Sequence, residues 1–220
     1  MLRAKDCKDL RENGHTNSGV YEIYPFDTSS RPVSVYCDME TMNGGWTVIQ
    51  KRVDGSLSFE RNWADYKNGF GTPEQNVWIG NDVIHQLTKG KTSSLYVSIT
   101  TFYITNWYEL YDQFSISNET EKYKLFLEGP AMGTLGDSML HTGDVYTELS
   151  GMYFTTSDRD NDRWSEGNCA VDWRGGWWFH KCHQGFLNGP WSSGDWINPW
   201  FPTLQNGKYI KETLMMVKRH

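Results

Sequence analysis

The sequence has neither a long hydrophobic run nor an excess of positive charge. In its 220 residues no apolar stretch approaches the roughly 20 residues that a transmembrane helix needs. The first six residues are too polar for the hydrophobic part of a secretory signal, so we expect a mature segment. The 21 basic and 27 acidic side chains give a net charge of −6, without a basic run. We therefore predict no membrane insertion and no nucleic-acid partner.

Cysteine is scarce, and the four cysteines form two groups. Cys7 stands with Cys37, and Cys169 stands with Cys182, without the C-x-x-C spacing of a zinc knuckle or redox site. Four cysteines allow three connectivities, and two local disulfides are the simplest of them. The shorter loop would contribute about 3 kcal/mol through loop entropy. Disulfides indicate an oxidising environment, so we expect a secreted, extracellular protein.

A sequon for N-linked glycosylation lies at Asn118-Glu119-Thr120. A triplet this short is explained equally well as unused surface. Because it agrees with the cysteines, we predict glycosylation of Asn118.

Aromatic residues and glycine are abundant. Aromatics make up 15% of the chain, with 11 Trp, and there are 21 Gly. This bias favours aromatic-lined surfaces between tight turns over long helices, as in a carbohydrate-binding or interaction module. The length suits one globular unit with its own core.

The strand signals come in short runs. Residues 19–52 alternate β-rich runs with turns and predict a small antiparallel meander. Residues 95–102, 123–128 and 209–217 predict strands of a central sheet, to which the chain returns at its end. The long segment 133–207 between them has little periodicity, so we expect the functional chemistry there.

Two short helices are predicted. Phe59, Trp63 and Tyr66 recur at i, i+4 and i+7 and indicate a helix that ends at Asn68-Gly69. Residues 83–87 indicate another, with a cap at Asn81 or Asp82. Both should pack against the core.

Three aspartates alternate in SDRDNDRWSEGNC, at positions 158, 160 and 162. Such a run is similar to the calcium loop of an EF-hand, where a hard cation gathers six to eight oxygens. The pattern then fails, because Arg163 replaces the loop glycine and Cys169 replaces the final glutamate. What remains is either a one-loop calcium cage of two carboxylates and backbone carbonyls, or a solvated Asx turn.

A series of strings in order along the chain resembles the fibrinogen-related domain of ficolins, tachylectins, tenascins, angiopoietins and fibrinogen. They are DCKDL, SGVYEIYP, VSVYCDMETMNGGWTVIQKR, DGSLSFERNWADYKNGFG, VWIGND, FTTSDRDND, GNCA, GGWWFHKCH and FLNG. The resemblance implies an α+β fold, the fibrinogen C-terminal domain fold, over one domain of residues 1–220. It implies a small N-terminal subdomain (1–48), a central twisted antiparallel sheet with short helices (49–132 and 208–220), and an irregular calcium-binding lobe (133–207).

The resemblance also implies a Ca²⁺ site. Asp160 and Asp162 would supply carboxylate oxygens, and Trp164 and Glu166 would supply backbone carbonyls. A cation in an irregular lobe orders backbone that no regular ladder holds, so we expect a structural role for it.

The segment AVDWRGGWWFHKCHQG near the second disulfide has several conceivable uses. A Cys182 nucleophile or a zinc site with His180 and His183 would need free thiolates, which the secreted context excludes. A glycosidase needs two carboxylates held apart across the scissile bond, whereas here they are bunched. We therefore expect a binding domain and not an enzyme.

In ficolin-like and tachylectin-like members the peptide bond before the second loop cysteine is cis, which here would be Lys181–Cys182. The resemblance implies that the N–H groups of Cys182 and His183 bind the oxygen of an acetyl group. It places Trp173 and the ring of His183 on the apolar walls. Trp196 or Trp200 is expected to add an aromatic, whereas for Trp177 and Trp178 we favour core packing.

These features predict a secreted, calcium-dependent lectin of innate-immune type that binds acetylated glycans such as N-acetylhexosamines on microbial surfaces. Weak single sites would need several copies, so we expect a homo-oligomer in the full-length protein. The alternative is a fibrinogen-type module for a peptide N-terminus, a receptor or a matrix ligand. Asp172 and Asp195 keep the peptide reading open, whereas the aromatic Trp173 at an acidic position of fibrinogen favours the acetyl group.

Overall fold

The computed structural model describes residues 3–26, 31–103, 106–191 and 196–220. The helices and strands follow in the order α1 (Cys7–Glu12), β1 (Gly19–Ile23), β2 (Val33–Asp38), β3 (Trp46–Arg52), α2 (Trp63–Asn68), β4 (Phe70–Gly71), β5 (Val77–Trp78), α3 (Asn81–Thr88), β6 (Ser93–Thr101), β7 (Asn106–Ile116), β8 (Leu125–Gly133), α4 (Cys169–Asp172), β9 (Ile197–Trp200), β10 (Leu204–Asn206) and β11 (Ile210–Arg219). Short 3-10 helices cover Thr41–Asn43, Glu119–Glu121 and Gly207–Tyr209. None of the helices in these ranges is long and apolar enough to span a bilayer.

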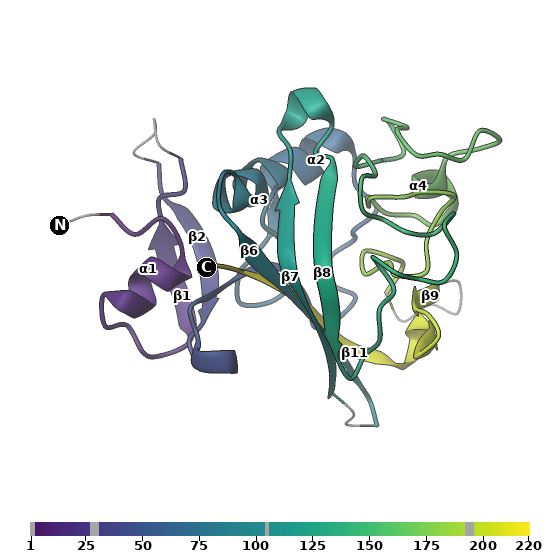
Figure 1. Cartoon of the computed structure of the whole chain (residues 1–220). Coiled ribbons are helices and arrows are strands. Elements are labelled where there is room, and N and C mark those ends of the chain that lie inside the picture. Colours follow the sequence, from purple (N-terminus) through teal and green to yellow (C-terminus); the bar gives the residue numbers. More distant parts are fainter. Residues whose placement is uncertain (1–2, 27–30, 104–105, 192–195) are drawn as a thin grey trace.

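One large antiparallel sheet organises the α+β fold. Its strand order among the described residues is β1-β2-β3-β11-β6-β7-β8, with the short β4 and β5 attached beside β3. In Figure 1 the N-terminal elements lie at one end of the molecule, the central strands in the middle, and a largely irregular lobe with α4 and β9 at the other end. The subdomain limits stay a prediction, because β1 to β3 belong to the same sheet as β6 to β8.

The C-terminal strand returns to the centre of the sheet, as predicted. Strand β11 pairs with β3 on one side and with β6 on the other, for example Met215 with Gln50 and with Val97. It runs back from the irregular lobe toward the N-terminal end of the molecule (Figure 1). The lobe is therefore attached covalently to a strand that is hydrogen-bonded along both edges.

The two predicted helices form as α2 and α3, with different starts, whereas α1 and α4 were not predicted. Helix α2 begins only at Trp63, because the Asn62 side chain accepts a hydrogen bond from the Asp65 N–H and caps it there, and Phe59 lies before it. Helix α3 has no side-chain cap, and the prediction of a cap at Asn81 or Asp82 was wrong. The reason is that the Asn81 carboxamide oxygen instead accepts a hydrogen bond from the Trp78 indole at 3.1 Å.

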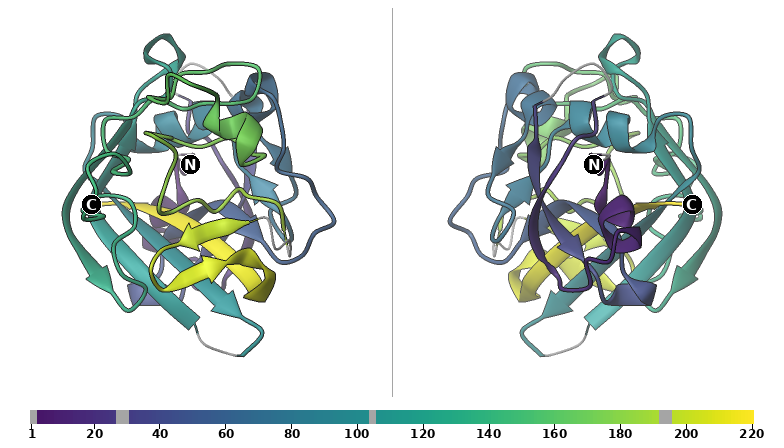
Figure 2. Two further views of the ribbon diagram at one scale, coloured as in Figure 1. Left: turned by 90° about the vertical axis from the view of Figure 1, so that its right-hand side faces the viewer. Right: turned by 90° about the vertical axis from the view of Figure 1, so that its left-hand side faces the viewer.

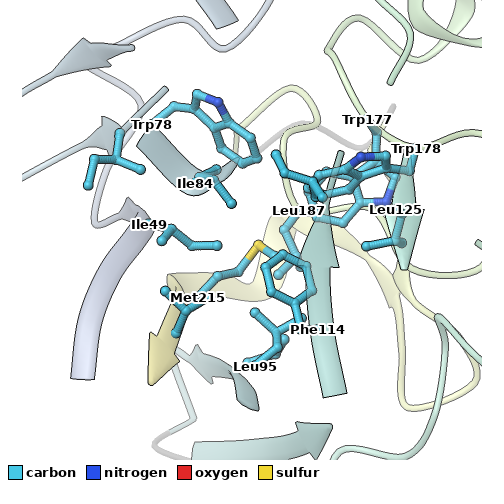
Figure 3. Close-up of a cluster of buried hydrophobic side chains, with 14 of the residues drawn as sticks. Ile49, Trp78, Ile84, Leu95, Phe114, Leu125, Trp177, Trp178, Leu187 and Met215 are labelled. Carbon is cyan, nitrogen blue, oxygen red and sulfur yellow. The ribbon is translucent and has the colours of Figure 1, made fainter. Parts of the chain in front are cut away.

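A continuous core joins the sheet to the lobe. Ile49, Leu95 and Met215 from the sheet are fully buried, as is Ile84 of α3. Figure 3 shows these side chains together with Trp177, Trp178 and Leu187 from the lobe. The Trp178 ring lies edge-on to Phe154 and Phe114, with ring centroids 5.2 and 6.4 Å away. Burial of such large side chains lets the lobe and the sheet share one hydrophobic interior.

Polar side chains of β3 hold the lobe segment 186–189 through hydrogen bonds. The Gln50 carboxamide donates to the Leu187 carbonyl and to the Asn188 side chain at 3.1 and 3.2 Å. Asn188 in turn donates to the Gly176 carbonyl at 3.0 Å. Because the Asn188 side chain is fully buried, these bonds satisfy groups that water does not reach. Figure 2 (left) shows the molecule from the side of the lobe.

Candidate functional site

The first aspartate of the loop holds helix α2. The Asp158 Oδ1 accepts hydrogen bonds from the Trp63 backbone N–H at 2.9 Å and from the Thr156 hydroxyl at 2.7 Å. Trp63 is the first helical residue, and its N–H has no acceptor inside the helix. Asp158 therefore joins the aspartate loop to α2 and serves as an anchor.

Asp160 and Asp162 lie close together and have no cationic partner within the described residues. The Asp162 N–H donates to Asp160 Oδ1 at 3.1 Å, and the Asp162 carboxylate accepts from the backbone N–H groups of Trp164 (2.7 Å) and Cys169 (2.8 Å). Burial raises the pKa of Asp162, and the neighbouring Asp160 carboxylate raises it further against these hydrogen bonds. Two neighbouring carboxylates without a counter-charge fit a hard divalent cation.

The predicted carbonyl ligands lie in the turn that follows. The Trp164 carbonyl accepts a long hydrogen bond from the Gly167 N–H at 3.4 Å, and Glu166 is exposed. No group of three or more His, Cys, Asp or Glu side chains that could hold a metal occurs in the described part of the chain. A cage here would thus need two carboxylates, backbone carbonyls and water, which are the oxygen ligands that Ca²⁺ accepts.

Helix α4 and the second disulfide position the residues beyond the cage. Asn168 caps α4 by accepting from the N–H groups of Ala170 and Val171 at 2.8 and 3.2 Å. Cys169 is bonded to Cys182, with a Cα–Cα distance of 5.4 Å. Both predicted disulfides form, since Cys7 and Cys37 are also bonded. Asp162 and the disulfide therefore meet at Cys169.

The peptide bond Lys181–Cys182 is trans, and the prediction of a cis bond was wrong. The cis bond among the described residues is Phe201–Pro202. The chain turns at Cys182 through a left-handed backbone conformation, with φ of 67°. A hydrogen bond of 3.0 Å from the His180 N–H to the Cys182 carbonyl closes this turn. Positive φ in a non-glycine residue is strained, and the disulfide holds the residue there.

The predicted acetyl donors have no partner of their own. In the described residues, neither the Cys182 N–H nor the His183 N–H donates a hydrogen bond to another group of the chain. His183 is 7% exposed, and neither of its ring nitrogens has a hydrogen-bond partner in this part of the structure. Burial lowers the pKa of His183 to about 3; the Asn198 backbone lies near enough to oppose this shift, but outside hydrogen-bond geometry. The imidazole is therefore neutral at physiological pH.

Trp173 lies against His183. The ring centroids are 5.0 Å apart in an edge-to-face arrangement, and Trp173 is partly exposed. The preceding helix α4 ends at Asp172, which places Trp173 at its C-terminal cap. The structure thus brings three of the predicted ligand residues, Trp173, Cys182 and His183, to one place.

Trp196 and Trp200 lie away from the surface. Both are fully buried, and their indole N–H groups donate to the carbonyls of Phe186 (2.9 Å) and Gly136 (2.6 Å). In this conformation they support the lobe and offer no ring face to a ligand. Trp177 and Trp178 are fully buried too, in agreement with the core packing predicted for them.

Other predicted positions are surface residues. Asp172 is exposed at the end of α4, while Asp195 lies outside the described residues. Asn118 is exposed, and its side-chain oxygen accepts a hydrogen bond from the Thr120 hydroxyl at 2.6 Å. The acceptor of the sequon is therefore accessible.

Sequence reasoning missed Arg52, the last residue of β3. It is 1% exposed, although arginine is rarely buried without a charged partner. The signal in WTVIQKR was weak: the strand is buried except for Lys51, and Gln50, two residues before Arg52, is fully buried.

Together, the antiparallel sheet, an aspartate loop and a disulfide-bound turn with free backbone donors define a binding module. The chain matches the family model "Fibrinogen beta and gamma chains, C-terminal globular domain" over residues 3–216. The chain belongs to this family, as its sequence motifs predicted.

Curated relatives and solved structures agree with this family assignment. Ryncolin-4 of Cerberus rynchops is 45% identical over 190 residues, which cover 86% of this chain and 52% of the relative. Fibroleukin of Homo sapiens is 45% identical over 185 residues, covering 84% and 41%. The chain thus spans about half or less of the length of these relatives.

Two solved structures are similar over nearly all of this chain. The fibrinogen-like globe domain of human ANGPTL2 has a TM-score of 0.87 and 36% identity, and 98% of each chain is covered. The lamprey fibrin D-dimer complexed with the peptide ligand Gly-His-Arg-Pro-amide has a TM-score of 0.84 and 34% identity, covering 97% of this chain and 73% of that one.

Proposed function

We propose that this chain is the recognition domain of a secreted, calcium-dependent lectin that binds acetyl groups of glycans on microbial surfaces. It acts by binding and not as an enzyme. The acetyl oxygen accepts hydrogen bonds from the N–H groups of Cys182 and His183, and the methyl group contacts Trp173 and the ring of His183.

The unpaired donors are the observation that carries this proposal. Two consecutive backbone N–H groups, at Cys182 and His183, lack an acceptor within the described residues. Unmet donors beside a buried ring are costly unless water or a ligand supplies the acceptor. An acetyl oxygen is a neutral acceptor, and it suits a site whose histidine is itself neutral.

The neighbouring walls suit the rest of the acetyl group. Trp173 and His183 lie edge-to-face and present apolar ring surface next to the donors. These rings favour a small methyl group over a charged ammonium. Among the described residues, no carboxylate contacts either ring and could balance the positive charge. Glucosamine, which lacks the acetyl group, would leave both donors unmet.

Calcium has a supporting role in the proposal. Asp160 and Asp162 would hold the ion together with the carbonyls of Trp164 and Glu166. When bound, the ion supplies a fixed positive charge that orders the loop. Asp162 reaches the ligand turn through Cys169, whose N–H it binds at 2.8 Å and whose sulfur is joined to Cys182. Loss of calcium would therefore disorder the aspartate loop and misplace the Cys182 and His183 N–H groups that bind the acetyl oxygen.

Secretion and assembly belong to the same proposal. The two disulfides and the exposed sequon at Asn118 favour an extracellular protein. Several copies in a homo-oligomer would give the avidity that a single weak site lacks.

Peptide binding is the second candidate. It is favoured by the similarity to the lamprey fibrin D-dimer, which was solved with a peptide ligand. The exposed carboxylate of Asp172, next to Trp173, would pair with the ammonium group of a peptide N-terminus.

Calorimetric titration separates the two candidates. The calcium-loaded chain is titrated with N-acetylglucosamine, glucosamine and Gly-His-Arg-Pro-amide, each also with chelator. The proposal predicts saturable, calcium-dependent heat from N-acetylglucosamine alone. Heat from the peptide alone would favour peptide binding, and no heat from any of the three would contradict both.

A further inference from the structure

Arg52 is a buried cation without a carboxylate partner. Its Nη1 donates to the carbonyls of Leu187 (3.2 Å) and Gly189 (2.5 Å), while its Nε has no partner. No ion pair joins Arg52 to a carboxylate in the described part of the chain. Burial lowers the pKa of Arg52 to about 9, so the guanidinium still carries its charge at neutral pH.

Aromatic rings surround this charge. The guanidinium carbon lies 4.3 Å from the ring centroid of Phe59, 5.0 Å from that of Trp191 and 5.2 Å from that of Trp196. Ring faces stabilise a cation through their quadrupole, but they do not neutralise it. A fully buried charge of this kind normally has a hydrogen-bonded counter-ion.

A cavity of about 290 Å³ lies beside Arg52. Its walls include Phe59 and Trp191, and Ser58, Glu60 and Arg174 add polar groups. This volume lies just below the range of roughly 300–1,000 Å³ that is typical of small-molecule sites. The cavity therefore suits one small ligand, about the size of a single sugar ring.

A second arginine borders the same cavity in an unusual backbone conformation. Arg174 has φ of 59°, in the left-handed region that favours glycine. Its Nε lies 3.1 Å from the Glu60 carboxylate, and both side chains are about half exposed. The lining side chains thus carry two positive charges and one negative charge, with the unpaired positive charge at Arg52.

We propose that this cavity is a second binding site, for the carboxylate group of an acidic monosaccharide such as a uronic acid. The carboxylate binds the Arg52 guanidinium, which lines the cavity, and supplies the missing counter-charge. The sugar ring packs on Trp191, and Glu60 and Ser58 accept hydrogen bonds from its hydroxyls. The small volume of the cavity favours one ring over an extended peptide.

Glucuronate and glucose form the matched pair of ligands that tests the site. They differ at carbon 6, where one has a carboxylate and the other a hydroxymethyl group. Calorimetry and thermal melting of the whole chain should show saturable binding of glucuronate at least tenfold tighter than that of glucose. Equal binding of the two sugars, or none of either, would overturn the proposal. So would binding of hippurate without glucuronate, because it would point to a peptide carboxylate.

Charge variants at the cavity mouth give effects of opposite sign. Arg174→Gln should weaken glucuronate binding severalfold, and Glu60→Gln should tighten it severalfold because it removes the negative charge of the lining. Arg11→Gln, on α1 at the far end of the molecule from α4 (Figure 1), removes the same charge and should change nothing. Unchanged affinity in both cavity variants would contradict the site.

Arg52→Lys completes the series. It keeps the charge but loses the planar guanidinium, and it should weaken glucuronate binding in a chain whose circular dichroism is that of the wild type. If it does not fold, the two mouth variants decide. N-acetylglucosamine titrations of the same variants should be unaffected, so failure of this site is distinguishable from failure of the acetyl site.

Discussion

At the residue scale, His183 shows how strongly burial sets chemical character in this lobe. The ring lies among Trp173, Phe179 and Phe186, with centroids 5.0 to 5.8 Å away. Charging it there would place a cation in an apolar environment without a hydrogen-bond partner, so the fold keeps it neutral. The unfolded chain has no such restriction.

This difference predicts acid sensitivity. Between the ordinary pKa of 6.5 and the folded value of about 3, the unfolded chain binds a proton that the folded chain does not. Stability should therefore fall as the pH decreases through 6.5, and well below that pH the slope from this residue should approach about 1.4 kcal/mol per pH unit. Urea unfolding of wild type and His183→Gln from pH 7 to 5 measures it, and parallel curves would contradict the assignment.

The aspartates are predicted to differ in role. Asp160→Ala should reduce calcium affinity at least tenfold, because it removes a cage carboxylate. Asp158→Ala should keep calcium affinity and lower the free energy of unfolding by about 1–3 kcal/mol, since the Trp63 N–H loses its acceptor. Terbium luminescence measures cation binding and urea unfolding measures stability in both variants. Loss of calcium binding in Asp158→Ala but not in Asp160→Ala would contradict this assignment of roles.

At the scale of elements, the second disulfide joins helix α4 to the ligand turn. Its cysteines are 13 residues apart, and its removal in Cys169→Ser/Cys182→Ser should cost about 3 kcal/mol. N-acetylglucosamine binding should be lost as well, because Cys182 would leave its left-handed conformation. Removal of Cys7–Cys37, at the other end of the sheet, should destabilise the chain while binding is retained. Retained binding in the first variant would show that the disulfide is not needed for the site.

The elements that sequence predicted best were those with clear periodicity. Alternation located β6 and the returning strand β11, and the turn residues marked their ends. The N-terminal cap of α3 was predicted wrongly because the Asn81 side chain accepts a hydrogen bond from the Trp78 indole, a contact that no local sequence pattern reveals. The 11-residue strand β7 was not identified, although it pairs with both β6 and β8.

In the candidate site, too, local motifs were predictable from the sequence and tertiary contacts were not. Positions near the disulfide were located through motifs, and three of them meet in the structure. The conformation of Cys182 could not be read from residue types, because backbone strain depends on the disulfide and its surroundings. The burial of Trp196 and Arg52 also depends on packing of the lobe onto β3, across more than 130 residues of sequence, as in the bond from Arg52 to Leu187.

At the scale of the whole molecule, calcium should couple the lobe to global stability. The lobe shares its core with the sheet, so a cation that binds only the folded state stabilises the entire domain. Calcium at a hundred times its Kd is worth about 2.7 kcal/mol, which should raise the Tm by about 5–10 °C for a chain of this length. Calorimetric melting with calcium, magnesium and chelator checks this, and identical melting curves would contradict a cation site.

The most direct test of the central claim is amide NMR of the ligand turn. The labelled, calcium-loaded chain is titrated with N-acetylglucosamine and, as control, with glucosamine. The account predicts saturable downfield shifts of the Cys182 and His183 amide protons with the acetylated sugar only. Amide protons that stay in place, or that respond equally to glucosamine, would contradict it.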